Sequence, residues 1–413
     1  MIKNARLPLI LSALVALSSC ATKPELPAPE NTPENTPENA PAERDEQRDS
    51  QDRKEGNASS TIRLLFAGDI MAHEENFVPG RFDRIWRHVS DKISAADLAF
   101  ANIESPVMDA KGWRAYPTFN MHTDYVEAAI KAGFDVFSLA NNHTNDQYLK
   151  GIQSTRDFFS SREGIWAAGL RKAAGEGPTY QIVEKDVADG GKWRILFVAF
   201  TELLNRPDYA EYVDYYQSTA EKRRELKGKL AKIKAESGCD IFVISVHTDE
   251  PEYILRVTEN HRKFFRELVN ECGADIVWAN HPHVAKEWEQ ISADDGRDAF
   301  IMYANGNTIS GQRRDPQFKA PATNRDYTGE GIFMEVTLEK KDDGKKSSVA
   351  IKDSSASLVT VMIADDGRYV LRFLDDKLLD TLDKAEYLKW RDYLFERKRI
   401  MESYIPALKK ERP

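Results

Sequence analysis

The sequence has few cysteines, no excess of positive charge and no apolar run of membrane-spanning length. Only three of its 413 residues are cysteine, so a metal site built from several thiolates is excluded. The net charge of -9 argues against a nucleic-acid partner, which requires a basic surface. The apolar run at residues 7–17 is too short to cross a bilayer as a stable helix. The length suits one large α/β domain with additions, or two domains.

The amino terminus has the layout of a secretory signal. Two basic residues precede the apolar run at 7–17, which is the order found in signal peptides. The segment Leu17-Ser18-Ser19-Cys20 resembles the lipobox of bacterial lipoproteins. This resemblance implies that residues 1–20 are a lipoprotein signal, that Cys20 carries a lipid, and that the protein is extracytoplasmic and anchored to a bacterial membrane. A plain cleaved signal with an incidental cysteine is the alternative.

Residues 21–60 have the composition of a tether. The unit Pro-Glu-Asn begins at Pro29, Pro33 and Pro37, and a charged tract follows it. The segment contains almost no apolar side chains, so it cannot bury enough surface to offset the entropy of ordering. We expect a disordered tether.

From residue 61 onward, apolar runs alternate with helical patterns. This β-α-β-α order predicts a largely parallel sheet in a domain over 61–340. After it, an Asp365-Asp366-Gly367 turn predicts a β-hairpin, and a helix over 383–402 completes a C-terminal addition over 341–413. The main helices are expected at 81–95, 123–132, 149–159, 258–272 and in a long segment that starts with a capping box of Ser218 and Glu221.

Six apolar runs of strand length end directly in polar side chains. Because the carboxyl ends of parallel strands meet at one edge, we expect these side chains to share one sheet edge. The candidate residues are Asp69, Glu104, Asn142, His143, His247, His281 and His283. Carboxylate, imidazole and amide oxygen suit Mn²⁺, Fe²⁺ or Zn²⁺. Any one of these histidines alone is more often structural, but their shared position favours a site for one or two divalent metal ions.

The two remaining cysteines precede strands at the opposite edge. Cys239 and Cys272 could form a disulfide in an extracytoplasmic compartment. We favour two thiols instead.

Motifs along residues 62–310 resemble those of the poly-γ-glutamate capsule synthesis (CapA) family. Proteins of this family are similar in fold to calcineurin-like metallophosphoesterases, so the resemblance implies a four-layer αββα sandwich of the α/β class. The motifs are Gly68-Asp69-Ile70-Met71, Asn102-Ile103-Glu104-Ser105-Pro106, Ala132-Gly133-Phe134-Asp135 with Ala140-Asn141-Asn142-His143 and Asp146, His247 to Glu250, Gly273-Ala274-Asp275 with His281-Pro282-His283-Val284, and Tyr303 to Asn307.

The resemblance also implies roles for these residues. The calcineurin-like metallophosphoesterases are the parent enzymes for this comparison, and Glu104 stands where an aspartate bridges two metals in them. Asp69 and His283 stand at the ligands of one metal, and Asn142, His247 and His281 stand at those of the other. His143 stands where the parent enzymes keep an acid for the leaving group, with Asp146 placed to orient it.

Three motifs depart from the pattern of the parent enzymes or of the CapA family. Met71 occupies a position where the parent enzymes have a metal-binding histidine, and His73 is the candidate replacement. Thr248-Asp249 replaces the family's usual Trp-Gly, and Tyr303-Ala304-Asn305 replaces a more usual Tyr-Ser-Leu. These differences indicate a divergent member.

Three functions are compatible with these residues. The first is an extracytoplasmic metal-dependent hydrolase that cleaves a phosphoester or a related bond in envelope material. The second is a non-hydrolytic lipoprotein that binds an anionic polymer such as polyglutamate and assists its synthesis, export or anchoring, together with polymer synthase partners. The third is a scaffold with a degenerate site, which would bind no metal.

Overall fold

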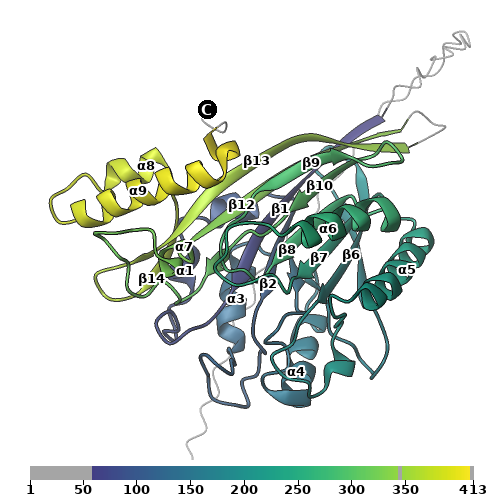
Figure 1. Ribbon diagram of the computed structural model, residues 1–413, viewed down its shortest axis with the longest axis horizontal. Coiled ribbons are helices and arrows are strands. Elements are labelled where there is room, and N and C mark those ends of the chain that lie inside the picture. Colours follow the sequence, from purple (N-terminus) through teal and green to yellow (C-terminus); the bar gives the residue numbers. More distant parts are fainter. Residues whose placement is uncertain (1–57, 343–346, 410–413) are drawn as a thin grey trace, which may run out of the picture. The chain divides into compact units, whose positions relative to one another are not determined.

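The computed structural model describes residues 58–342 and 347–409. They belong to one compact unit, Lys54–Pro413. The expected signal, the lipid site at Cys20 and the tether up to residue 57 lie outside the described residues. The last three residues of the expected tether, 58–60, instead begin the first strand, because they pair with the strand that ends at Asp342. Figure 1 shows long strands with helices packed around them.

The first sheet combines parallel and antiparallel strands. Its order is β14-β13-β12-β1-β2-β3-β4, with β11 paired to β1. The pairs β1–β2, β2–β3, β3–β4 and β1–β11 are parallel, whereas β12, β13 and β14 continue the sheet in antiparallel fashion. The strands are β1 (Ala58–Ile70), β2 (Leu98–Ile103), β3 (Val136–Ser138), β4 (Trp166–Ala168), β11 (Asn307–Ile309), β12 (Glu330–Asp342), β13 (Ser347–Ile363) and β14 (Tyr369–Phe373).

The second sheet has a parallel centre between two antiparallel edge strands. Its order is β5-β6-β7-β8-β10-β9. The pairs β6–β7, β7–β8 and β8–β10 are parallel. The strands are β5 (Tyr180–Asp186), β6 (Lys192–Thr201), β7 (Ile241–His247), β8 (Ile276–Asn280), β9 (Trp288–Ser292) and β10 (Asp298–Met302).

Three hydrophobic clusters separate four layers. In β1, Ile62, Leu64 and Phe66 join the cluster between the sheets, whereas Leu65 and Ala67 face the opposite way, which is the two-residue alternation of a strand. The second cluster fills the space between the first sheet and α1 to α4, and the third packs α5 and α6 on the second sheet. The expected αββα sandwich is therefore confirmed.

The helices that cover the sheets mostly agree with the prediction. They are α1 (Asp83–Trp86), α2 (Ser90–Ser94), α3 (Thr123–Lys131), α4 (Tyr148–Ser160), α5 (Ala220–Ser237) and α6 (Glu259–Cys272).

Two local predictions about helices are wrong. The helix expected at 81–95 is broken into α1 and α2, because Val89 leaves the helical region with φ -127° and ψ -12°. The cap of α5 is Thr219, whose side chain accepts the N–H of Lys222, rather than Ser218. Ser218 instead donates to Asp249.

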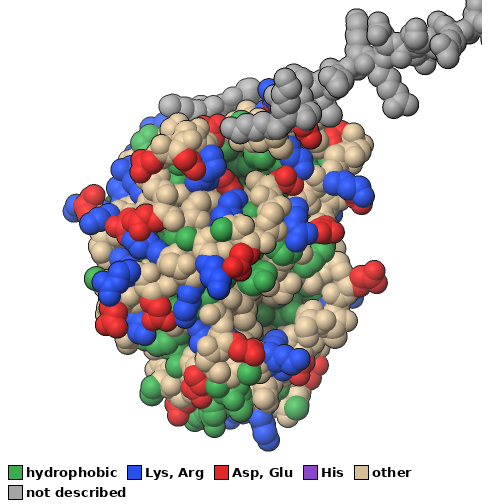
Figure 2. All heavy atoms as spheres, turned by 90° about the vertical axis from the view of Figure 1, so that its right-hand side faces the viewer, with side chains coloured by type: hydrophobic (Ala, Val, Ile, Leu, Met, Phe, Trp, Pro, Cys, Tyr) green, Lys and Arg blue, Asp and Glu red, His purple; other side chains and the backbone are tan. Residues whose placement is uncertain are grey.

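Helix α5 presents a charged outer face. Lys222 and Lys229 both pair with Glu225, at 2.9 and 2.8 Å. Lys227 pairs with Glu267 of α6 at 2.7 Å. Figure 2 shows the corresponding mixture of basic and acidic side chains on this side of the molecule. The lysines of α5 thus form a solvated, paired surface.

The C-terminal region packs on the first sheet. It contains α8 (Asp376–Thr381) and α9 (Leu388–Tyr404), so the helix expected at 383–402 begins later. Arg397 of α9 is buried and donates to Glu330 of β12 at 2.6 and 2.9 Å. Arg313 also pairs with Glu330. This buried Arg-Glu-Arg group ties α9 to the loop that precedes β12.

Cys239 and Cys272 are free thiols, as the sequence favoured. In the described part of the chain, none of the helices combines the length and apolar character needed to cross a bilayer.

Gly68 allows β1 to approach the loop before β11. A Cβ atom at Gly68 would lie 1.8 Å from the carbonyl oxygen of Gly306. The N–H of Asp69 donates to the same carbonyl at 3.0 Å, and the N–H of Gly68 donates to Thr308 Oγ1 at 2.7 Å. The close approach therefore fixes Asp69 at the strand exit.

Gly68→Ala should destabilise the protein, because the added methyl group would push β1 away from the Gly306 carbonyl. Forcing such a group into a packed site reduces the free energy of unfolding by about 1–3 kcal/mol. Chemical denaturation measures the change. Gly112→Ala is the control, since a Cβ atom there meets no atom within 4 Å. Equal unfolding midpoints for the two variants would contradict this account.

Candidate metal centre

The predicted polar residues meet at one end of the sandwich, but they come from two sheets rather than from one sheet edge. The exits of β1, β2 and β3 deliver Asp69, Glu104 and Asn142. The exits of β7 and β8 deliver His247, His281 and His283. All six side chains are buried.

Asp69, Glu104 and His283 form a first group that could hold a metal ion. Their donor atoms lie within 4.8 Å of one another. Nδ1 of His283 is 3.3 Å from Oδ2 of Asp69, and Nε2 of His283 is 3.7 Å from Oε1 of Glu104. Asn102 donates from Nδ2 to Oδ1 of Asp69 at 2.8 Å. That bond orients the carboxylate and leaves Oδ2 for a cation.

Glu104, His247 and His281 form a second group, again with donor atoms within 4.8 Å. Nε2 of His247 is 3.8 Å from Oε1 of Glu104. The same Nε2 is 2.8 Å from Oδ1 of Asn142, which places the amide beside this group. Glu104 belongs to both groups, as the resemblance implied for a bridging carboxylate.

Several donor atoms of these groups have no hydrogen-bond partner among the described residues. They are Oδ2 of Asp69, both carboxylate oxygens of Glu104 and Nδ1 of His281. Unpartnered buried polar atoms are rare in folded proteins, and each lowers stability. One or two divalent ions would satisfy these atoms. The donor set, oxygen and imidazole nitrogen, also suits such ions.

The electrostatics of the site favour a bound cation. Burial raises the pKa of the Glu104 carboxyl well above its usual range, and the charge of Asp69 raises it further. Burial, followed by the neighbouring imidazoles, lowers the pKa of His247 and of His281 well below 6.5. These imidazoles are therefore neutral and offer lone pairs to a metal. A cation would offset the two buried carboxylate charges.

The loop that carries His281 and His283 has an unusual backbone. Both residues have positive φ, 104° and 58°. Such conformations are unfavourable by about 1–3 kcal/mol each for residues other than glycine. The N–H of Tyr253 donates to the carbonyl of Pro282 at 2.9 Å and helps to hold the loop. The surrounding structure thus maintains a strained segment that aims two imidazoles at one site.

His143 lies beside the metal ligands and is paired with Asp146, as the sequence predicted. Nδ1 of His143 is 2.7 Å from Oδ2 of Asp146. The same oxygen accepts the N–H of Phe119 at 2.8 Å, which fixes the carboxylate. Asn205 Nδ2 lies 3.3 and 3.4 Å from the two ring nitrogens of His143. With Nδ1 held by Asp146, Nε2 is the nitrogen left to exchange a proton with a ligand.

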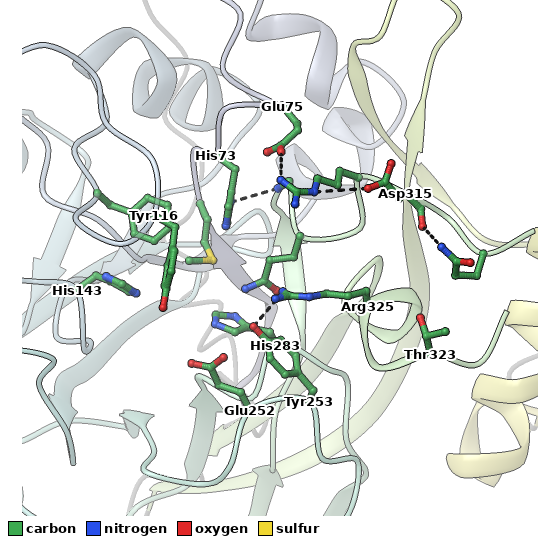
Figure 3. A pocket seen from close by; sticks show the side chains of 16 residues that line it. His73, Glu75, Tyr116, His143, Glu252, Tyr253, His283, Asp315, Thr323 and Arg325 are labelled. Carbon is green, nitrogen blue, oxygen red and sulfur yellow. Dashed lines mark hydrogen bonds and ion pairs between the residues drawn. The ribbon is translucent and has the colours of Figure 1, made fainter.

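A cavity of about 700 Å³ opens in front of the site. His143 and His283 form part of its floor, and aromatic and charged side chains form its walls (Figure 3). The volume is within the range of sites that bind small molecules or segments of a polymer.

Comparison with known proteins decides the family. The family model described as "Bacterial capsule synthesis protein PGA_cap" matches residues 63–312, which is more than half of the chain. The chain belongs to the PGA_cap family. The matched range contains all of the predicted metal ligands together with His143 and Asp146.

Relatives of this PGA_cap chain include two proteins from Bacillus. "Capsule biosynthesis protein CapA" of Bacillus anthracis is 26% identical over 275 residues, 61% of this chain and 60% of that protein. "PGA biosynthesis protein CapA" of Bacillus subtilis is 25% identical over 341 residues, 78% of this chain and 83% of that protein. A similar solved structure is the calcineurin-like phosphoesterase YfkN from Bacillus subtilis, with 14% identity, a TM-score of 0.38 and coverage of 82% of this chain and 99% of that chain.

One candidate ligand of this PGA_cap chain was missed from the sequence. The Glu252 carboxylate groups with His281 and His283, within 4.8 Å, although the residue is exposed. It lies in the loop after β7, where no strand exit marks it. The grouping of Glu252 with two histidines from another loop depends on the tertiary fold.

The prediction that His73 replaces a missing ligand stays a prediction. His73 lines the same cavity as Met71 and His283. However, it is not in the four ligand groups found among the described residues. Burial, followed by the charges of His283 and His143, lowers the pKa of His73 to about 3. Its Nδ1 accepts the N–H of Gly311 at 3.3 Å.

A buried ionic cluster behind the second sheet was also missed. Glu202 pairs with Arg223 at 2.6 Å and with Nε2 of His261 at 2.7 Å. Asp249 lies 3.1 Å from the same Nε2. The N–H of Glu202 donates to the carbonyl of His247 at 2.9 Å, so the cluster supports a metal ligand from behind. Its members come from α5, α6 and the loops after β6 and β7, and no local pattern connects them.

Divalent metal should stabilise the protein. With Mn²⁺ at about 100 times its Kd, chelator-treated protein should gain about 2.7 kcal/mol, which corresponds to a rise in Tm of about 4 °C. Glu104→Gln should raise the Tm of the chelator-treated protein, because it removes a buried charge beside Asp69, and should abolish the rise with metal. Thermal unfolding followed by circular dichroism measures both effects.

Glu75→Gln is the matched control for this experiment, since Glu75 lines the cavity but pairs with Arg314 at 3.0 Å. It should keep the rise in Tm with metal. A full rise in Glu104→Gln would show that the metal binds elsewhere.

The cluster around His261 should make stability depend on pH. Burial alone would lower the pKa of His261, but hydrogen bonds to Asp249 and Glu202 raise it to about 9. Protonated His261 therefore stabilises the folded protein by about 3 kcal/mol. This contribution is fully present below pH 6.5 and is lost as the pH rises through about 9. Between pH 6.5 and 9.5, the unfolding free energy should fall more in the wild type than in His261→Gln. Parallel pH curves would refute the assignment.

Proposed function

We propose that the chain is a capsule or cell-envelope protein whose metal centre acts on an anionic polymer of the poly-γ-glutamate type by metal-dependent hydrolysis. The observation that carries the proposal is the set of unpartnered buried donor atoms from Asp69, Glu104 and His281 beside an open cavity. Membership of the PGA_cap family and relatives named for capsule biosynthesis support the polymer as the target.

The ligand groups suit hydrolysis. One or two divalent ions held by these groups would make a water molecule acidic and stabilise charge on the bond under attack. Asp69 and Glu104 would supply the negative charge that holds the ions. Asn102 orients the Asp69 carboxylate through its hydrogen bond, and Oδ1 of Asn142, 2.8 Å from Nε2 of His247, is placed to serve as a further oxygen ligand.

His143 has the position of a general acid. Asp146 holds Nδ1, so Nε2 is the nitrogen that would pass a proton to the departing group of the substrate. The pair lines the cavity through His143 and therefore has access to a bound substrate.

The proposal includes a place for the protein. The basic and apolar segments before Cys20 support a lipid anchor, and the composition of residues 21–57 supports a tether. The domain would then act outside the cytoplasm, near the membrane where a polymer synthase delivers its product.

A second candidate function is non-hydrolytic handling of the polymer. The two relatives are named for biosynthesis rather than for degradation. Met71 cannot supply the imidazole that the parent enzymes place at this position. In this reading the metal centre binds carboxylates of the polymer and assists its export or anchoring.

The first function is tested by measuring whether metal-loaded protein cleaves a γ-linked glutamate polymer and a small phosphodiester. His143→Ala should lower kcat about 10²–10³-fold with metal content unchanged, because general acid catalysis contributes that much. His281→Ala should lose metal as well as activity. The measurements are the chain length of the polymer, the release of nitrophenol from a nitrophenyl phosphodiester, and the metal content by elemental analysis.

Asp146→Asn is the companion variant, because it keeps the shape of the partner of His143 but removes its charge. It should lower kcat with metal content unchanged, because Nδ1 of His143 loses its charged partner. Full turnover by His143→Ala would rule out its role as the acid. Metal binding without turnover of either substrate would favour polymer handling.

A further inference from the structure

An arginine outside the family match faces the metal centre across the cavity. Arg325 lies beyond residues 63–312 and lines the same cavity as His143 and His283. In Figure 3 its guanidinium points toward the middle of the cavity, near His283 and Tyr253. A ligand that reaches the metal site must therefore pass close to this positive charge.

The guanidinium of Arg325 has no ion-pair partner among the described residues. Its one side-chain hydrogen bond there goes from Nη1 to the Tyr253 hydroxyl, at 3.1 Å. The other arginine of the cavity differs. Arg314 pairs with Glu75 at 3.0 Å and with Asp315 at 3.6 Å. Arg325 thus keeps most of its donors free for a ligand.

Glu252, the remaining acidic residue of the cavity, also interacts with the Tyr253 hydroxyl but forms no ion pair with Arg325 in the described structure. Glu252 has no ion pair in the described structure and groups with His281 and His283, on the metal side. A divalent ion at those residues would engage its charge. The uncompensated positive charge on the cavity wall is then that of Arg325.

The backbone that carries Arg325 is held firmly. Arg325 belongs to the short helix α7 (Asn324–Tyr327), which begins with a capping box between Thr323 and Asp326. Asp326 is buried and accepts a hydrogen bond from the hydroxyl of Tyr393 in α9 at 2.6 Å. The position of Arg325 is therefore set before any ligand binds, which reduces the entropy lost on binding.

Tyr253 connects Arg325 to the loop of metal ligands. The Arg325 guanidinium carbon lies 4.9 Å from the centre of the Tyr253 ring, and that ring lies 6.1 Å from the His283 ring. The backbone of Tyr253 is also bonded to Pro282. One side chain therefore separates the guanidinium from the metal ligands, so a single ligand can contact both.

We propose that Arg325 determines specificity by binding an anionic group, a carboxylate or a phosphate, of a substrate whose reacting bond lies at the metal centre. A guanidinium presents two parallel N–H groups that match the two oxygens of such an anion. The inference rests on the proposed function and names the substrate class: molecules with a second negative charge close to the bond that reacts. A repeating polyanion meets this requirement at every unit.

Isothermal titration calorimetry on the metal-loaded protein tests the proposal with two probes, a γ-linked glutamate tetramer and tripolyphosphate. Arg325→Ala should raise the Kd of at least one probe about tenfold, or about 1.4 kcal/mol. Arg325→Lys should recover part of the affinity, since it keeps the charge but loses the planar fork. Arg314→Ala is the matched control and should change Kd less than twofold, because its charge is already paired.

The two probes separate the sources of the anion. A larger effect of Arg325→Ala on the glutamate tetramer identifies a carboxylate subsite, and a larger effect on tripolyphosphate identifies a phosphate subsite. The proposal is overturned if the wild type binds neither probe, or if Arg325→Ala and Arg314→Ala change both Kd values equally.

Two further readouts keep this test separate from that of hydrolysis. In Arg325→Ala, metal content and turnover of a small phosphodiester without a second charge should match the wild type. A loss of metal would instead assign Arg325 a structural role and refute the proposal. If the wild type turns over no substrate but the Kd still depends on Arg325, the hydrolytic function fails while the anion subsite stands.

Discussion

Two carboxylates held side by side away from water constrain the rest of this structure. Asp69 and Glu104 are buried at the exits of adjacent strands, and each raises the energy of the other when both are charged. Removing such groups from water is unfavourable unless an opposite charge is close by. No arginine or lysine pairs with either carboxylate in the described structure, and the imidazoles of His247 and His283 lie 3.3 to 3.8 Å from their oxygens. A divalent cation at this place would offset both charges.

The two sheets place polar side chains from both sides next to those carboxylates. The first sheet provides oxygen donors, and the second sheet provides the nitrogen donors of His247, His281 and His283. The cluster between the sheets fixes their separation, because aromatic side chains such as Phe66, Phe100 and Trp278 pack tightly there. The indole of Trp278 also donates to the carbonyl of Ala67 at 2.8 Å, directly linking the two sheets. Rigid packing in the core thus sets the geometry at the edge.

The sequence predicted what depends on local pattern. Each ligand follows an apolar run, so the switch from apolar to polar residues marks Asp69, Glu104 and His247 without tertiary information. The break at Val89 and the cap at Thr219 were not predicted, because neighbouring residues offer nearly equivalent choices and tertiary contacts select among them. Glu252 lies in a loop, Arg325 lies in the short helix α7, and the cluster of Glu202 with His261 joins distant elements. Their roles depend on a folded arrangement that a pattern of neighbours does not encode.

The cavity in front of the metal centre has two walls of different origin, and the buried Glu330 helps to support one of them. The wall made by the strand exits belongs to the range shared with the family, whereas the wall with Arg325 is anchored through Arg313, Glu330 and Arg397 to the C-terminal helix. Substitutions on the second wall can leave the ligand groups untouched. Evolution could therefore change which molecules this centre accepts independently of the chemistry that it performs, with α9 as the support on which new selectivity is built.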